Sequence, residues 1–199
     1  YVDDLKERFK EVINEVLRLR KITDVYLVVG GDIVHADTAG RTTTSGTQLE
    51  MTMQPHEALA AAIEYVVWCT DYLRALGTDI TLVPVRGNHD RMMSVSAAMA
   101  VGQRFRHRPS SLGVPGDVSK KAVREMPETI QAESRQLVGK TERTALFTGH
   151  LHHAKIVDKK GTIHYQCPTP IPADGYHVKE GYVGTRKLLQ AVVLTPQSG

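Results

Sequence analysis

Residues 25–35 read Val-Tyr-Leu-Val-Val-Gly-Gly-Asp-Ile-Val-His, an apolar run that ends in two glycines and then becomes polar. Such a run predicts a strand covered on both faces, as in the centre of an α/β sheet. The arrangement recurs twice, because Ile80–Val85 leads into Gly87–Asp90 (GNHD) and Thr144–Thr148 leads into Gly149–His153 (GHLHH). Ligands of open α/β sheets bind where the carboxyl ends of strands converge. The sequence therefore predicts an α/β protein with a polar site at three strand ends.

The side chains that follow these strands are Asp, Asn and His, which together offer carboxylate and amide oxygens and imidazole nitrogens. This mixture suits a divalent cation such as Mn, Fe or Zn. The pattern therefore indicates metal-assisted chemistry.

In the same order, the three segments resemble motifs of the calcineurin-like metallophosphoesterases. GDIVH (31–35) resembles G-D-x-x-[DH], GNHD (87–90) resembles G-N-H-[DE], and GHLH (149–152) resembles G-H-x-H. The resemblance extends over roughly residues 25 to 180, and the contexts GDIVHAD and GNHDR look closest to the repair nucleases and phage proteins of that family.

Two further family motifs have no counterpart in this sequence. No D-x-H occurs before Gly31, so we expect the family's first strand to be missing from the chain as given. The isolated His of the fourth motif is also absent, since His107 is the only histidine between Asp90 and Gly149. The nearest look-alike, Val114–Asp117 (VPGD), has proline where histidine is expected. Either residues are missing near 108–116, or the second metal site is weakened.

The resemblance implies two divalent metal ions, with Mn favoured and Fe, Zn or Ni as alternatives. It makes Asp32 the bridging ligand, with His152 on the first metal. It places Asn88 and His150 on the second metal.

Residues in and beside these motifs that are not expected to bind metal have other predicted roles. His89 would meet the substrate phosphate and assist the leaving group, and Asp90 would hold the His89 ring in one tautomer. His35 would support Asp32 or line the cleft, Arg91 would meet a substrate phosphate or form a surface ion pair, and His153 would be an additional residue near the site.

The implied function is hydrolysis of phosphodiester bonds by a hydroxide that two metal ions activate, with DNA or RNA as candidate substrates. One alternative is a degenerate member of the fold that serves as a non-catalytic binding or assembly module, which the two absent motifs favour. Another is a phosphatase that uses one metal. Neither a membrane partner nor an oligomeric state is predicted.

The sequence predicts a single domain over 1–199, and the resemblance implies a four-layer αββα sandwich of two mixed β-sheets. The stretch 37–54, rich in Thr, Ser and Gly, is expected to be a long loop, either functional or an ordinary flap. Helices are predicted over 3–20, 55–76 and 92–105, helical composition over 118–138, and strands over 144–148, 162–166 and 189–194.

Composition is that of an ordinary globular domain, with 41% hydrophobic and 24% charged residues and a net charge of +3. This balance permits a phosphate-bearing substrate without arguing for one. Cys69 and Cys167 form neither a disulfide framework nor a CxxC site, so we expect a cytoplasmic protein with Cys69 as a buried thiol. No signal peptide or bilayer-spanning stretch is expected.

Overall fold

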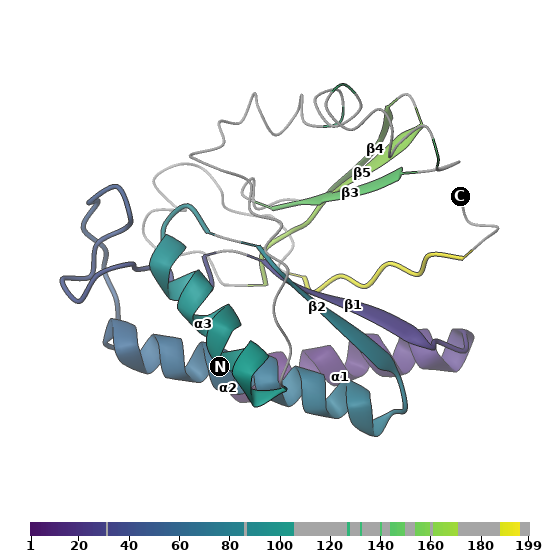
Figure 1. The fold of residues 1–199 in the computed structure, drawn as a ribbon, viewed down its shortest axis with the longest axis horizontal. Coiled ribbons are helices and arrows are strands. Elements are labelled where there is room, and N and C mark those ends of the chain that lie inside the picture. Colours follow the sequence, from purple (N-terminus) through teal and green to yellow (C-terminus); the bar gives the residue numbers. More distant parts are fainter. Residues whose placement is uncertain are drawn as a thin grey trace. The chain divides into compact units, whose positions relative to one another are not determined.

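The computed structural model describes two compact units of mixed α/β structure (Figure 1). The first comprises Tyr1–Lys10 and Leu17–Asp117, and the second comprises Glu11–Val16 and Val118–Gly199. The described residues form three helices and two sheets. These residues are 1–30, 32–85, 87–105, 127, 132, 140, 144–149, 154–159, 161–170 and 188–195. The arrangement as a single domain stays a prediction.

The first unit is built around two parallel strands, β1 (Asp24–Val29) and β2 (Asp79–Pro84). Helix α2 (Pro55–Ala75) lies between them in the sequence, which makes a β-α-β unit. Val29 is opposite Pro84, and the Val85 N–H donates to the Val29 carbonyl at 2.9 Å, so pairing continues past the proline. Both strands therefore deliver the chain to the same edge of the sheet.

Three helices confirm the predicted ones, and each of their ends lies within one residue of the predicted end. They are α1 (Val2–Leu19), α2 and α3 (Arg91–Arg104). Pro55 opens α2 beside a capping box formed by Gln54 and Glu57. The chain leaves α2 through Gly77, whose φ of +79° suits glycine.

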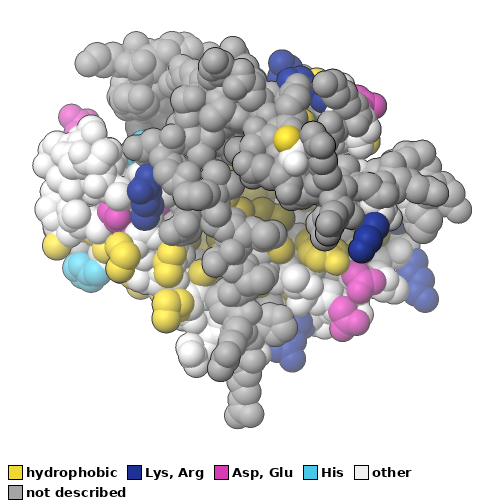
Figure 2. Space-filling view, turned by 45° about the horizontal axis from the view of Figure 1, so that its top comes forward, with side chains coloured by type: hydrophobic (Ala, Val, Ile, Leu, Met, Phe, Trp, Pro, Cys, Tyr) yellow, Lys and Arg dark blue, Asp and Glu magenta, His cyan; other side chains and the backbone are white. Residues whose placement is uncertain are grey.

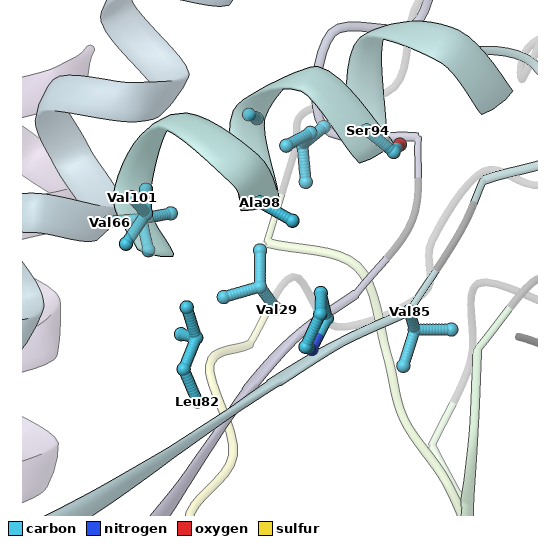
Figure 3. Close-up of a pocket in the computed structure, with 10 residues that line it drawn as sticks. Val29, Val66, Leu82, Val85, Ser94, Ala98 and Val101 are labelled. Atoms are coloured by element: carbon cyan, nitrogen blue, oxygen red, sulfur yellow. The ribbon is translucent and has the colours of Figure 1, made fainter. Parts of the chain in front are cut away.

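The core of the first unit lies between the sheet and the helices α2 and α3. Val66 of α2, Leu82 of β2 and Val101 of α3 are buried together. Partly buried residues packed against them are Leu27, Val29, Ile63, Val67 and Phe105. Figure 3 shows Val29 and Leu82 beneath Val101 and Ala98, with Ser94 nearer the start of α3. This packing fixes α3 against the strands whose ends carry the candidate site.

The opposite face of β1 is exposed. Tyr26 is 70% and Val28 is 44% exposed, and exposed and half-buried residues alternate along the strand. Within the first unit no described residue buries this face, so the cover of β1 on both faces stays a prediction.

Helix α1 packs on α2 through what we call the aromatic interface, formed by Phe9, Tyr65, Trp68 and Tyr72. The ring of Phe9 meets the rings of Trp68 and Tyr72 edge-on, with centroids 6.1 and 6.3 Å apart. At its margin, Lys6 Nζ lies 3.0 Å from a Glu64 carboxylate oxygen. No residue of α1 is fully buried, so this contact is a surface seam rather than a core.

The second unit contains a three-stranded sheet in the order β3-β5-β4. Strands β3 (Thr144–Thr148) and β5 (Thr162–Gln166) are parallel, and β4 (Lys155–Lys159) is antiparallel to β5. The first two were predicted, whereas β4 was missed because its sequence, KIVDK, is largely charged. The strand predicted over 189–194 is wrong, since 188–195 contains no strand. The helical composition predicted over 118–138 falls almost wholly outside the described residues, so it stays a prediction.

Across the described part of the chain, no helix combines the length and the apolar character needed to cross a membrane.

Candidate active site at the ends of two parallel strands

The residues that follow β1 and β2 meet in what we call the strand-end cluster, consisting of Asp32–Asp37 and Gly87–Met93. The Asp32 carboxylate accepts a hydrogen bond from the backbone N–H of His89 at 2.8 Å. Asp32 and His35 have φ angles of +59° and +70°, in the left-handed region that residues with a β-carbon rarely occupy. Strained backbone of this kind persists where surrounding bonds hold it, and it concentrates at functional sites.

The buried carboxylate of Asp90 binds the backbone of the first segment of the cluster, Asp32–Asp37. Asp90 is 0% exposed. Its oxygens accept from the backbone N–H groups of Asp32, Val34 and His35 at 3.1, 2.7 and 3.3 Å. The Ser94 hydroxyl, one turn into α3, also donates to it. One buried side chain thus fixes the backbone that presents Asp32 and His35.

Burial raises the pKa of Asp90 to about 6, and the nearby Asp32 carboxylate adds to the shift. The hydrogen bonds from Ser94 and from the backbone of Val34 and His35 oppose it, because they favour the ionised form. The resemblance implied that Asp90 would hold the His89 ring. Its hydrogen bonds go to the 32–35 backbone and to Ser94 instead, so its observed role is to fix the neighbouring loop.

The imidazole rings of His35 and His89 lie against each other. Their Nδ1 atoms are 3.2 Å apart, their centroids are 5.0 Å apart, and both residues are half-buried. Such a bond requires that one Nδ1 carries a hydrogen and the other does not. The Nε2 atom of His89 is on the side of the ring away from this bond. His35 therefore orients the ring that the sequence predicted to act on substrate.

Gly87 is required by the close approach of the two segments. A β-carbon at this position would come closer than 3.0 Å to the Asp90 carboxylate and to both the backbone N and the carboxylate of Asp32. No side chain fits there without moving one of these groups. The glycine of GNHD thus allows Asp32 and the Asp90 carboxylate to lie directly against the backbone of residue 87.

A third aspartate, Asp37, holds the start of α3. Its Oδ1 accepts from the backbone N–H groups of Met92 and Met93 at 2.7 and 3.1 Å, which are the bonds that an N-cap side chain makes. Asp90 occupies the N-cap position but makes no such bond. Each segment therefore supplies the carboxylate that binds the backbone of the other.

Thr44, in the predicted loop 37–54, extends the contact with the segment Gly87–Met93. Its hydroxyl donates to Asp37 Oδ2 at 2.9 Å and accepts from the Arg91 N–H at 3.2 Å. Its backbone N–H donates to the His89 carbonyl at 2.8 Å. This part of the predicted long loop is hydrogen-bonded to the site, which favours the functional interpretation over an ordinary flap.

The described part of the predicted metal site offers oxygen donors. Asp32 accepts one bond at Oδ1, and a carboxylate has about four acceptor positions, so it retains capacity for a cation. Asn88 is half-buried next to His89 and can offer an amide oxygen. The chemistry of these two donors fits a divalent ion. Within the described residues, no group of three or more His, Cys, Asp or Glu side chains is arranged to hold a metal.

Of the other predicted site residues, the structure describes Arg91 alone. His150, His152 and His153 lie outside the described residues, so their place relative to Asp32 and Asn88 stays a prediction. Arg91 is half-buried as the first residue of α3.

Sequence reasoning missed Asp37, Thr44 and Ser94. The motif GDIVHAD contains Asp37, and an Asp shortly before a helix is a capping signal. However, Asp37 caps a helix that begins far along the chain.

Comparison with family models, with curated proteins and with solved structures finds no match to this chain. The proposed function therefore rests on the sequence motifs and on the arrangement of the strand-end cluster.

Proposed function

We propose that this chain is a metal-dependent phosphoesterase that hydrolyses phosphodiester bonds. The observation that carries the proposal is the meeting of GDIVH and GNHD at the ends of parallel strands, with Asp32 bonded to the His89 backbone and His35 bonded to the His89 ring. Asp32 and Asn88, together with His150 and His152, would hold the metal ions. Bound there, divalent ions would polarise the phosphoryl oxygens and supply a nucleophile at neutral pH.

The residues of the chain would divide the remaining work. The bond between the Nδ1 atoms of His89 and His35 would fix the His89 ring and leave its Nε2, on the other side of the ring, to meet a substrate oxygen. A protonated His89 can give its Nε2 proton to the departing alcohol oxygen, which is general-acid catalysis. Asp90 keeps the 32–35 backbone in place during turnover through its four accepted bonds.

Surface charge does not narrow the substrate. On the face drawn in Figure 2, the described basic side chains are interspersed with acidic ones rather than gathered in a strip. A nucleic acid is thus one candidate among phosphodiesters.

We also propose that the two sheets belong to a four-layer αββα sandwich. We further propose that the protein is cytoplasmic, since Cys69 and Cys167 are both free thiols.

The test is turnover of bis(p-nitrophenyl) phosphate with added Mn²⁺, alongside the number of metal ions bound per chain. His89→Ala should lower kcat by about 10²- to 10⁴-fold, the usual contribution of a general acid, while metal content stays at the wild-type value. Asp32→Ala should lower both. His56→Ala removes an exposed histidine at the start of α2 and should change neither.

Wild-type protein that binds no metal and turns over no phosphodiester with Mn²⁺, Fe²⁺, Zn²⁺ or Ni²⁺ would refute the proposal. The alternative of a non-catalytic binding module would then lead.

A further inference from the structure

The backbone N–H and the backbone carbonyl of His89 are both hydrogen-bonded to residues outside the segment Gly87–Met93. Its N–H donates to Asp32, and its carbonyl accepts from the Thr44 N–H. The turn that follows is held by Asp37, through Met92 and Met93 directly and through the Thr44 hydroxyl and Arg91. The direction of the His89 Cα–Cβ bond therefore depends on the 37–44 loop.

Within this loop, Asp37 makes the central contacts. Its Oδ1 binds the first turn of α3 and its Oδ2 binds Thr44, so a single half-buried carboxylate joins helix and loop. The negative charge also lies at the positive end of the α3 dipole, which strengthens the contact. Asp90 does not perform this task, because its carboxylate is directed to the 32–35 backbone.

From this geometry we infer that Asp37 is a positioning residue for the proposed phosphoesterase reaction. Its two carboxylate oxygens bind the Thr44 hydroxyl and the backbone N–H groups of Met92 and Met93. It acts through Thr44 and the first turn of α3 to hold the His89 imidazole against His35. The inference rests on the proposed function for its kinetic consequences, but the position of the His89 ring can be measured without turnover.

The kinetic test compares Asp37→Ala with Asp37→Asn in the full chain with Mn²⁺. Asp37→Ala should lower kcat about 10- to 100-fold with KM and bound metal little changed, since small displacements of a catalytic group have effects of this size. Asp37→Asn keeps an oxygen that can accept from Met92 and Met93, so it should restore most of the rate. Asp3→Ala, which removes a 97% exposed carboxylate from the first turn of α1, should leave kcat at the wild-type value.

A double-mutant cycle separates positioning from general stability. If Asp37 acts through His89, then adding Asp37→Ala to His89→Ala should reduce kcat further by less than about twofold, because coupled residues are non-additive. Equal losses in both backgrounds would overturn the inference and leave Asp37 as a structural cap. Thr44→Val should show the same coupling to His89, and Thr44→Ser should restore the rate.

The measurement that does not depend on activity is the rate at which diethyl pyrocarbonate modifies each histidine, followed by mass spectrometry. Asp37→Ala should increase the modification rate of His89 severalfold and leave that of exposed His56 unchanged. An unchanged rate at His89 would overturn the inference. If the wild type proves inactive on every phosphodiester, the proposed function fails, and this measurement alone decides whether Asp37 positions His89.

Discussion

The strand-end cluster and the aromatic interface hold segments together by opposite means. In the cluster, three carboxylates bind backbone N–H groups of the partner segment, and Asp90 is fully buried. Between α1 and α2, half-buried rings meet edge-on, and the ion pair of Lys6 with Glu64 has one exposed partner. We therefore expect the stability of the cluster to depend on a few contacts that cannot be replaced, and that of the interface to be spread over several contacts that can.

The largest effect is expected for Asp90→Ala. It removes the acceptor of three backbone N–H groups and one hydroxyl in a buried place. We expect the free energy of unfolding to fall by about 3–5 kcal/mol, since each unsatisfied buried donor costs about 1–3 kcal/mol. Urea unfolding followed by the fluorescence of Trp68, the single tryptophan, measures this in the unit that holds the cluster. A loss below about 1 kcal/mol, the size of one exposed hydrogen bond, would show that the cluster is replaceable.

Gly87→Ala tests the same cluster by overpacking. The added methyl group must displace Asp90 or Asp32, so we expect a loss of about 2–3 kcal/mol in the same unfolding experiment. Gly30→Ala is the matched control, because a β-carbon there meets nothing within 4 Å. Equal effects of the two substitutions would contradict the tight approach at Gly87.

Phe9→Ala probes the aromatic interface. Phe9 loses edge contacts with Trp68 and Tyr72, but it is only half-buried. We expect a loss of about 1–2 kcal/mol, as for an aromatic pair with partial burial. Phe9→Leu should recover about half of that loss by refilling the space. A loss as large as that of Asp90→Ala would remove the distinction between the two regions.

The smallest effect is expected for Lys6→Ala at the margin of the interface. The Lys6 side chain is 17% exposed and its Glu64 partner is 70% exposed, and ion pairs with a partner in solvent contribute about 0.2–1 kcal/mol. The loss should shrink further in 0.5 M NaCl, because salt screens such pairs. A loss that is large and independent of salt would mean that Lys6 contributes chiefly by packing its side chain over Trp68.

Much of this architecture follows from local sequence rules. Local patterns predict where β1 and β2 end, to within one residue of Val29 and Pro84. They also predict that α2 begins at Pro55 and that Gly77 ends it. The meeting of GDIVH with GNHD also follows, since parallel neighbouring strands end at one edge.

The use of the two carboxylates could not be predicted in this way. Asp90 directly precedes α3, so the local rule assigns it to the cap of its own helix. The structure gives that task to Asp37, because burial of Asp90 against the 32–35 backbone satisfies three N–H groups that would otherwise have no partner. Only the packing of distant segments decides between the two, and a local pattern contains no information about it.

This exchange of carboxylates also has a consequence for folding order. The Val34 N–H is bound by a residue 56 positions later, and the Met92 N–H by one 55 positions earlier. Neither bond can form until the two strand ends have come together. We therefore expect the two amide protons to report the same free energy of opening in hydrogen exchange, since a single cooperative opening exposes both.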